Sequence, residues 1–176
     1  MGGNRPIKAV VRSAHDTRMN AMKARPAAIA VCLLLLATYI NAASRDFVLV
    51  KNTAQRYFPS ATWREHSLVR GDFTCSGKQE VAMLGTTESE ILVAVFVNGP
   101  TTKPDMLHYS ASGRNASTAV LSTEDLDFDP KKEIGYALPG FQRSKTCKGL
   151  NLSDGQVDSA HIYWNHDAKR FEDWTR

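Results

Sequence analysis

Acidic side chains are the groups in this chain most able to do chemistry. The run Glu124–Asp129 is dense in acids, and Asp72 and Glu80 lie on either side of a turn rich in Ser and Gly. Glycosidases use pairs of carboxylates, and residues far apart in sequence can form such pairs. The run could also offer oxygen ligands to a divalent ion, but it lacks the turn glycine and the spaced final acid of a calcium loop. We expect it to be a solvated acidic loop.

The other usual catalytic groups form no motif. His161 and His166 are five residues apart across a predicted strand end, which places them on opposite faces and argues against a zinc pair. The sequence has no Gly-x-Ser-x-Gly elbow, His-Glu-x-x-His helix or Gly-rich phosphate loop. Cys75 and Cys147 are each other's obvious partner, so a disulfide is favoured over a reactive thiol. We predict no cofactor and favour a non-enzymatic role.

One segment resembles a known calcium-binding hairpin. Arg70–Leu84 reads RGDFTCSGKQEVAML, which is similar to the loop of FG-GAP (VCBS-type) repeats, Gly-Asp-Phe-Asn-Gly-Asp-Gly-x-x-Asp followed by small and apolar residues. In that family, carboxylates and one backbone carbonyl of the loop hold the ion. The resemblance implies that the corresponding ligands here are the following: Asp72, Thr74, Ser76, Glu80 and the carbonyl of Lys78.

This segment also departs from the family pattern. Two of the four carboxylates are hydroxyls, Lys78 adds a positive charge, and calcium affinity falls as ligand charge is removed. The motif occurs once, whereas family members repeat it around a propeller. We predict that the hairpin keeps its shape with the Cys75 disulfide in place of the ion. Asp72 should accept backbone N–H groups around Ser76–Gly77, and Gly77 should have a positive φ.

Aromatic residues gather near the C-terminus. Exposed aromatics on a secreted sheet can stack on sugar rings or anchor a protein partner, and Tyr163 and Trp174 are the candidates for that role. We expect Trp164 and Trp63 to belong to the core.

The hydrophobic pattern predicts an α+β fold that is mainly β. Residues 46–58 have the apolar spacing of a short helix, which Pro59 ends. Ile91–Val97 (ILVAVFV) is the most apolar run and should be the central strand, whereas Leu126–Ser153 should be a long irregular excursion held by Cys147. The other predicted strands are 67–73, 80–84, 106–110 and 119–123, with a closing hairpin of 160–164 and 170–174. Together they predict the N-terminal helix packed on a mostly antiparallel sheet, with one disulfide.

The first 42 residues have the pattern of an export leader. Lys23 and Arg25 precede the apolar run 27–40, which is shorter than the roughly 20 residues of a membrane span. Cleavage is expected after Ala42 or Ala43, which leaves a single globular domain, 43–176. An uncleaved anchor is the alternative, and the start codon could be Met1, Met19 or Met22.

Charge and cysteine content agree with export. Six of the 22 basic residues and one of the 18 acidic residues lie before residue 43, so 16 and 17 remain, a formal net charge of −1. Such a domain has no overall field that would attract nucleic acid or an anionic membrane. A single cysteine pair is typical of an oxidising compartment, either the periplasm or the cell exterior.

These observations favour an exported binding or accessory domain with an unknown protein or carbohydrate ligand. The chain resembles small exported single-domain proteins of Gram-negative bacteria. The alternative is a small secreted hydrolase in which Asp72, Glu80 or acids of Glu124–Asp129 converge. A deep pocket with two acids and a perturbed pKa would favour the hydrolase, and a flat aromatic patch would favour the binding domain.

Overall fold

The computed structural model describes residues 46–113, 115–155 and 158–175. The predicted leader, 1–42, with its apolar run 27–40, lies outside these residues. Within them, no helix is long and apolar enough to cross a membrane. Residues 46–57 are helical, as predicted, and the helix ends just before Pro59. Val50 and Ala54, four residues apart, are fully buried on one face of this helix.

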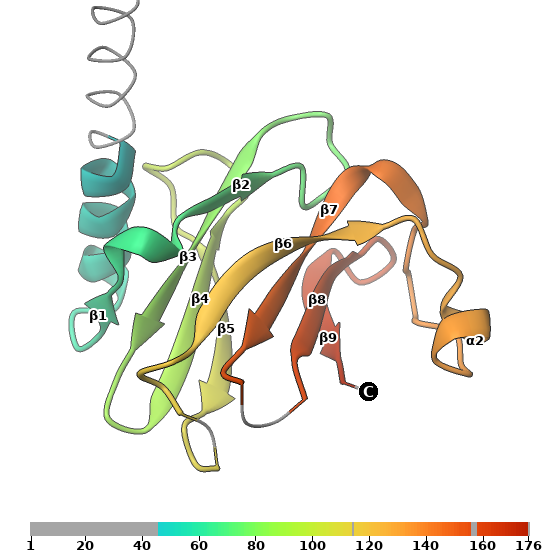
Figure 1. Cartoon of the computed structure of the whole chain (residues 1–176). Helices are drawn as coiled ribbons and strands as arrows, with labels where there is room; N and C mark the ends of the chain where they lie inside the picture. Colours follow the sequence, from blue (N-terminus) through green and yellow to red (C-terminus); the bar gives the residue numbers. More distant parts are fainter. Residues whose placement is uncertain (1–45, 114, 156–157, 176) are drawn as a thin grey trace, which may run out of the picture. The chain divides into compact units, whose positions relative to one another are not determined.

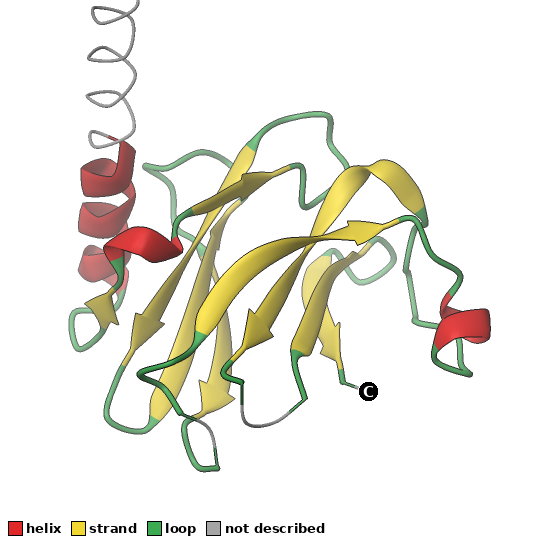
Figure 2. Ribbon diagram, viewed as in Figure 1, coloured by secondary structure: helices red, strands yellow, loops and turns green. Residues whose placement is uncertain are grey.

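The first sheet is antiparallel and packs against this helix (Figures 1 and 2). Its strands follow the order β1-β3-β4-β5, and β2 also pairs with β3. A 3₁₀ turn, η1 (Glu65–Ser67), connects β1 to β2. The strands are β1 (Thr62–Trp63), β2 (Val69–Gly71), β3 (Glu80–Thr86), β4 (Glu90–Phe96) and β5 (Asp105–Ser110).

The second sheet is also antiparallel, in the order β6-β7-β8-β9. A short helix, α2 (Pro130–Glu133), interrupts the connection between its first two strands. Its strands are β6 (Val120–Leu126), β7 (Ser144–Ser153), β8 (Ala160–Asn165) and β9 (Arg170–Trp174). Because each strand pairs with its neighbour in sequence, this sheet is a simple meander.

The strand β4 is apolar along its whole length because it is buried on both faces. Ile91, Val93 and Val95 face the second sheet, and the residues between them face the helix. In the first sheet β4 lies between β3 and β5, which confirms the prediction of a central strand.

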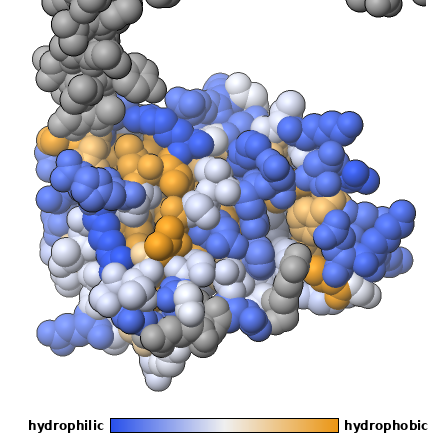
Figure 3. Space-filling view, in the orientation of Figure 1, coloured by the Kyte–Doolittle hydropathy of each residue, from blue (hydrophilic) through white to orange (hydrophobic). Residues whose placement is uncertain are grey.

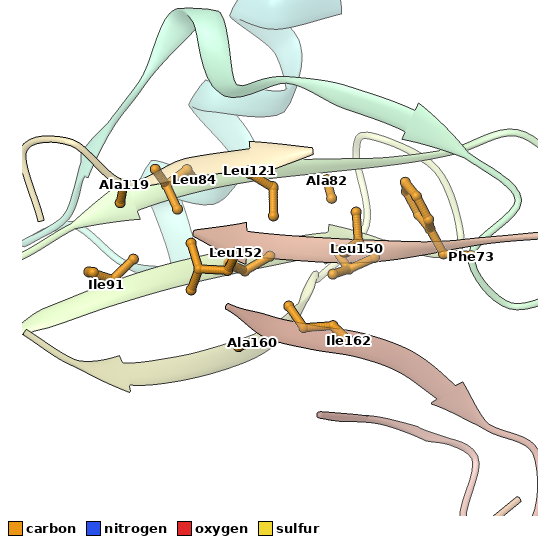
Figure 4. Packing of buried hydrophobic residues seen from close by; sticks show 12 residues of the cluster. Phe73, Ala82, Leu84, Ile91, Ala119, Leu121, Leu150, Leu152, Ala160 and Ile162 are labelled. Atoms are coloured by element: carbon orange, nitrogen blue, oxygen red, sulfur yellow. The ribbon is translucent and has the colours of Figure 1, made fainter. Parts of the chain in front are cut away.

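The largest core lies between the two sheets (Figure 4). Leu84 and Ile91 of the first sheet meet Leu121, Leu152 and Ile162 of the second, all less than 5% exposed. Figure 3 shows apolar surface beside the N-terminal helix, whereas the side around α2 is mainly hydrophilic.

Three parts of the sequence prediction need correction. Leu126–Ser153 is not irregular throughout, because residues 144–153 form β7, an inner strand of the second sheet. Lys148 and Gly149 obscure its alternation, in which Leu150 and Leu152 point into the core. The β-rich part is therefore two sheets and not one.

Trp63 is buried as predicted, but Trp164 is only half-buried and contacts Phe171 edge-on.

The predicted disulfide is confirmed. Cys75 is bonded to Cys147, with a Cα–Cα distance of 5.2 Å, and it joins the hairpin between β2 and β3 to β7 in the other sheet. Beside it, the Lys148 N–H donates to the Asp72 carbonyl at 3.1 Å. Covalent and hydrogen-bonded links thus hold the two sheets together at this end.

Candidate functional site

A row of four side chains crosses the outer face of the second sheet, one from each strand. Because Leu150, Leu152 and Ile162 point into the core, residues at alternate positions point outward. In β7 and β8, Asn151 lies opposite His161, and in β9 Trp174 lies opposite His161. Glu124 of β6 lies opposite Gly149, which has no side chain to cover this part of the face.

These side chains hold the imidazole of His161 in one orientation. His161 Nδ1 is 2.7 Å from Glu124 Oε2, and the ring stacks on the Trp174 ring with centroids 4.1 Å apart and an interplanar angle of 12°. The Asn151 Nδ2 lies 3.5 Å from the same Glu124 oxygen and 3.2 Å from His161 Nδ1. The His161 and Glu124 side chains are 18% and 22% exposed, so solvent still reaches the pair.

The hydrogen bond to Glu124 assigns the tautomer of neutral His161. An ionised carboxylate only accepts hydrogen bonds, so Nδ1 carries the proton. The other ring nitrogen, Nε2, then bears a lone pair that can accept a hydrogen bond or a proton.

His161 and Trp174 form part of the wall of an open hollow of about 240 Å³. The opposite wall comes from the connection between β6 and β7, which folds over the outer face. Phe128 packs there against Phe141 and Trp174, with centroid distances of 5.0 and 6.1 Å. The lining residues are Glu124, Asp125, Asp127, Phe128, Glu133, His161 and Trp174.

The ionisable lining of the hollow is acidic. Among the described residues, the lining contains four acidic residues, and its only basic residue is His161. Lys148 is bonded to Asp125, and Arg143 Nε is 2.7 Å from Asp127 Oδ1, but neither basic residue lines the hollow. These two ion pairs offset the charges of Asp125 and Asp127, which leaves Glu124, bonded to His161, and the exposed Glu133 as the other acids of the lining.

The hairpin between β2 and β3 has the turn that its Asp and Gly residues predict. The carboxylate of Asp72 accepts the N–H groups of Ser76 and Gly77 at 2.8 and 2.9 Å. Gly77 has a φ of +75°, and Cys75 also lies in the left-handed region with a φ of +56°. The predictions for Asp72 and Gly77 are therefore confirmed.

The second acid of this hairpin is also bonded to the chain itself. Glu80 is 3% exposed, and its Oε2 accepts the N–H groups of Phe73 and Thr74 at 2.8 and 2.9 Å, while Oε1 accepts the Thr74 hydroxyl. Burial raises the pKa of Glu80 above its ordinary value, and the bonds from Thr74 and Phe73 offset part of that rise. Thr74, Ser76, Lys78 and Glu80 do line one hollow, of about 280 Å³, together with Trp164.

The two candidate binding aromatics are both buried. Tyr163 is 3% exposed, and its hydroxyl donates to the Pro139 carbonyl at 3.1 Å and lies 3.2 Å from Glu172 Oε2. Burial and the charge of Glu172 raise the pKa of Tyr163 to about 12. Trp174 is 8% exposed and lines the hollow beside His161.

The acidic run is not simply a solvated loop. Its first residues, Glu124 and Asp125, belong to β6, and Glu124 is committed to His161. Sequence reasoning missed His161 and Asn151 as site residues. The alternating pattern of the closing hairpin does place His161 and Trp174 across from each other, so their proximity could have been predicted from the sequence.

Among the described residues, no group of three or more His, Cys, Asp or Glu side chains is placed to hold a metal ion. A third hollow, of about 430 Å³, lies between η1 and β6, where the Arg64 guanidinium is bonded to the carbonyls of Ala116 and Ala119.

No known family model, curated protein or solved structure matches this chain.

Proposed function

We propose that this protein is an exported binding domain whose ligand site is the hollow on the outer face of the second sheet. The observation that carries the proposal is the orientation of His161, which is bonded to Glu124 and stacked on Trp174 at the wall of an open hollow. Four strands contribute to this arrangement, and rigid sheet residues position a binding group more accurately than loop residues do.

The outer face of the second sheet carries a smaller hydrophobic cluster that includes Leu126, Leu138 and Trp174, and the polar row lies beside it. The inter-sheet core is complete on the other face, and an outer face can be covered by short polar side chains. Here the connection between β6 and β7 instead folds over the sheet and leaves a hollow beside His161. Packed walls with a few oriented polar groups are typical of ligand sites.

A small secreted hydrolase is the second candidate, because a carboxylate-oriented imidazole is also the arrangement of a general base. Among the described residues that line the hollow there is no Ser, Thr or Cys. Water would therefore have to be the nucleophile, with His161 Nε2 taking its proton. Hydrolysis of chromogenic esters or glycosides that is lost in His161→Ala would favour this candidate over a binding domain.

Fragment mapping by NMR tests the binding site without knowledge of the ligand. Isotope-labelled domain 43–176 is screened against a mixed library of neutral, cationic and anionic fragments. We expect hits to perturb the resonances of His161, Trp174 and Phe128, and His161→Ala to weaken them. His108→Ala is the matched control, because His108 also faces a glutamate, Glu90, at 3.3 Å, but on the first sheet. Hits confined to the third hollow, beside Arg64, or no hits at all, would contradict the proposal.

The export part of the proposal has its own test. N-terminal sequencing of the protein recovered outside the cytoplasm should begin at Ala43 or Ser44. An intact chain in the membrane fraction would instead indicate that the leader is retained as an uncleaved membrane anchor.

A further inference from the structure

We propose that the hollow binds a cationic group of its ligand, a guanidinium or an ammonium on a short aliphatic chain. This inference rests on the proposed binding function of the same hollow and names the chemical class of what it takes.

The lining of the hollow offers mainly hydrogen-bond acceptors. With Nδ1 of His161 bonded to Glu124, neutral His161 offers its ligand the acceptor Nε2. Of the other lining acids, Asp125 and Asp127 are paired with Lys148 and Arg143, and the ionised carboxylate of Glu133 can also only accept. A ligand that matches such a wall must be rich in donors, and guanidinium and ammonium groups carry five and three donors, respectively, and no acceptor. Sugars and neutral amides present as many acceptors as donors and would leave several of these groups unmatched.

Two aromatic side chains, Phe128 and Trp174, also line the hollow. Phe128 lies beside Trp174 with the two rings tilted by 51°, so the aromatic side of the hollow is built from packed residues. Cations are attracted to aromatic faces, and guanidinium groups combine that contact with bidentate bonds to carboxylates. Imidazole, carboxylate and aromatic groups together therefore favour an organic cation over a bare metal ion, for which the described residues offer no cluster of ligands.

The volume of the hollow limits the size of the group that it can hold. A hollow of about 240 Å³ is smaller than the roughly 300–1,000 Å³ of sites that enclose a drug-sized molecule. It can hold the end of a chain such as an arginine or lysine side chain, with the rest of the ligand outside. Glu133 of α2 is exposed and belongs to the lining, so it can meet a charged group that enters from solvent.

Calorimetric titration of folded 43–176 with three ligands of matched shape separates charge from fit. The ligands are butylguanidinium, its neutral analogue butylurea, and pentanoate. We expect butylguanidinium to bind at least tenfold more tightly than butylurea and pentanoate not to bind. A capped arginine amide in the same series distinguishes the two sources of this chemistry. Tighter binding than butylguanidinium points to a polypeptide side chain, and weaker binding points to a free small cation.

Two exposed glutamates supply the variant and its control. Glu133→Gln removes one carboxylate of the lining without disturbing a packed residue and should weaken butylguanidinium binding three- to tenfold. Glu88→Gln, in the exposed turn between β3 and β4, should leave it unchanged. Equal or tighter binding of butylurea or pentanoate overturns the inference, as does equal loss in both variants. If neutral fragments occupy the hollow and cations do not, only this inference fails; if nothing occupies it, the proposed function fails as well.

Discussion

Removal of the Cys75–Cys147 disulfide should lower the thermal unfolding midpoint by roughly 10–16 °C. The bonded cysteines are 72 residues apart in the chain. The chain-entropy relation gives roughly 4.4 kcal/mol of stabilisation for a loop of that length. With an unfolding entropy of about 2.1 cal/mol/K per residue, a domain of about 130 residues loses about 16 °C for that free energy.

Relief of backbone strain in the native state should offset part of this loss of stability. Cys75 has a φ of +56°, a region that costs a non-glycine residue about 1 kcal/mol or more, and the hairpin can relax once the bond is gone. That relaxation accounts for the lower end of the range. The hydrogen bond from Lys148 to the Asp72 carbonyl should then be the main remaining link at this end.

The assay is circular dichroism melting of domain 43–176 and of the double variant Cys75→Ser/Cys147→Ser. Wild-type protein in reductant should melt like the double variant, and the double variant should not respond to reductant. A midpoint within about 3 °C of the oxidised protein would refute the reasoning, because it would mean that the bond does not restrict the unfolded chain as calculated.

Three further changes test other parts of the fold. Asp72→Ala removes the acceptors of two N–H groups at Ser76–Gly77 and should lower the free energy of unfolding by about 1–2 kcal/mol in denaturant titrations; chelator should leave the melting midpoint of the wild type unchanged. Gly140→Ala should destabilise by more than 2 kcal/mol, because an added Cβ would stand 1.9 Å from Asn165 Oδ1 at a φ of +59°. For Tyr163, whose pKa is raised to about 12, the stabilising effect of the protonated phenol is complete below pH 10 and is lost as the pH rises from 10 to 12. The unfolding free energy of the wild type should therefore fall more steeply over that window than that of Tyr163→Phe, and parallel pH profiles would count against a buried, protonated phenol.

Local chemistry explains the parts of the fold that sequence predicted. The helix is marked by apolar spacing and Pro59, and the turn by Asp72 and Gly77, whose roles depend only on residues within a few positions. The disulfide followed from the cysteine count beyond the predicted leader, because Cys32 lies within the leader and only Cys75 and Cys147 remain. The strand β7 was missed because Lys148 and Gly149 interrupt its apolar alternation and look like loop residues until the second sheet supplies a face for Leu150 and Leu152.

The candidate site was harder to predict because it depends on sheet order. Glu124 and His161 are 37 residues apart, and they meet only because β7 lies between β6 and β8 with Gly149 in the register that leaves room. Sequence pattern alone sets the faces of a strand, but not which distant strand pairs with it. The burial of Tyr163 likewise depends on a connection, 127–143, whose path has no periodic signal.

A crystal structure of domain 43–176 soaked with butylguanidinium is the most direct test of the central claim, that the hollow beside His161 is the ligand site. The account predicts density for the guanidinium within hydrogen-bonding distance of His161 Nε2 or a lining carboxylate, with its chain leading out past Glu133. Density only in the third hollow, beside Arg64, or in the hollow beside Trp164, with the hollow beside His161 holding water alone, would contradict it.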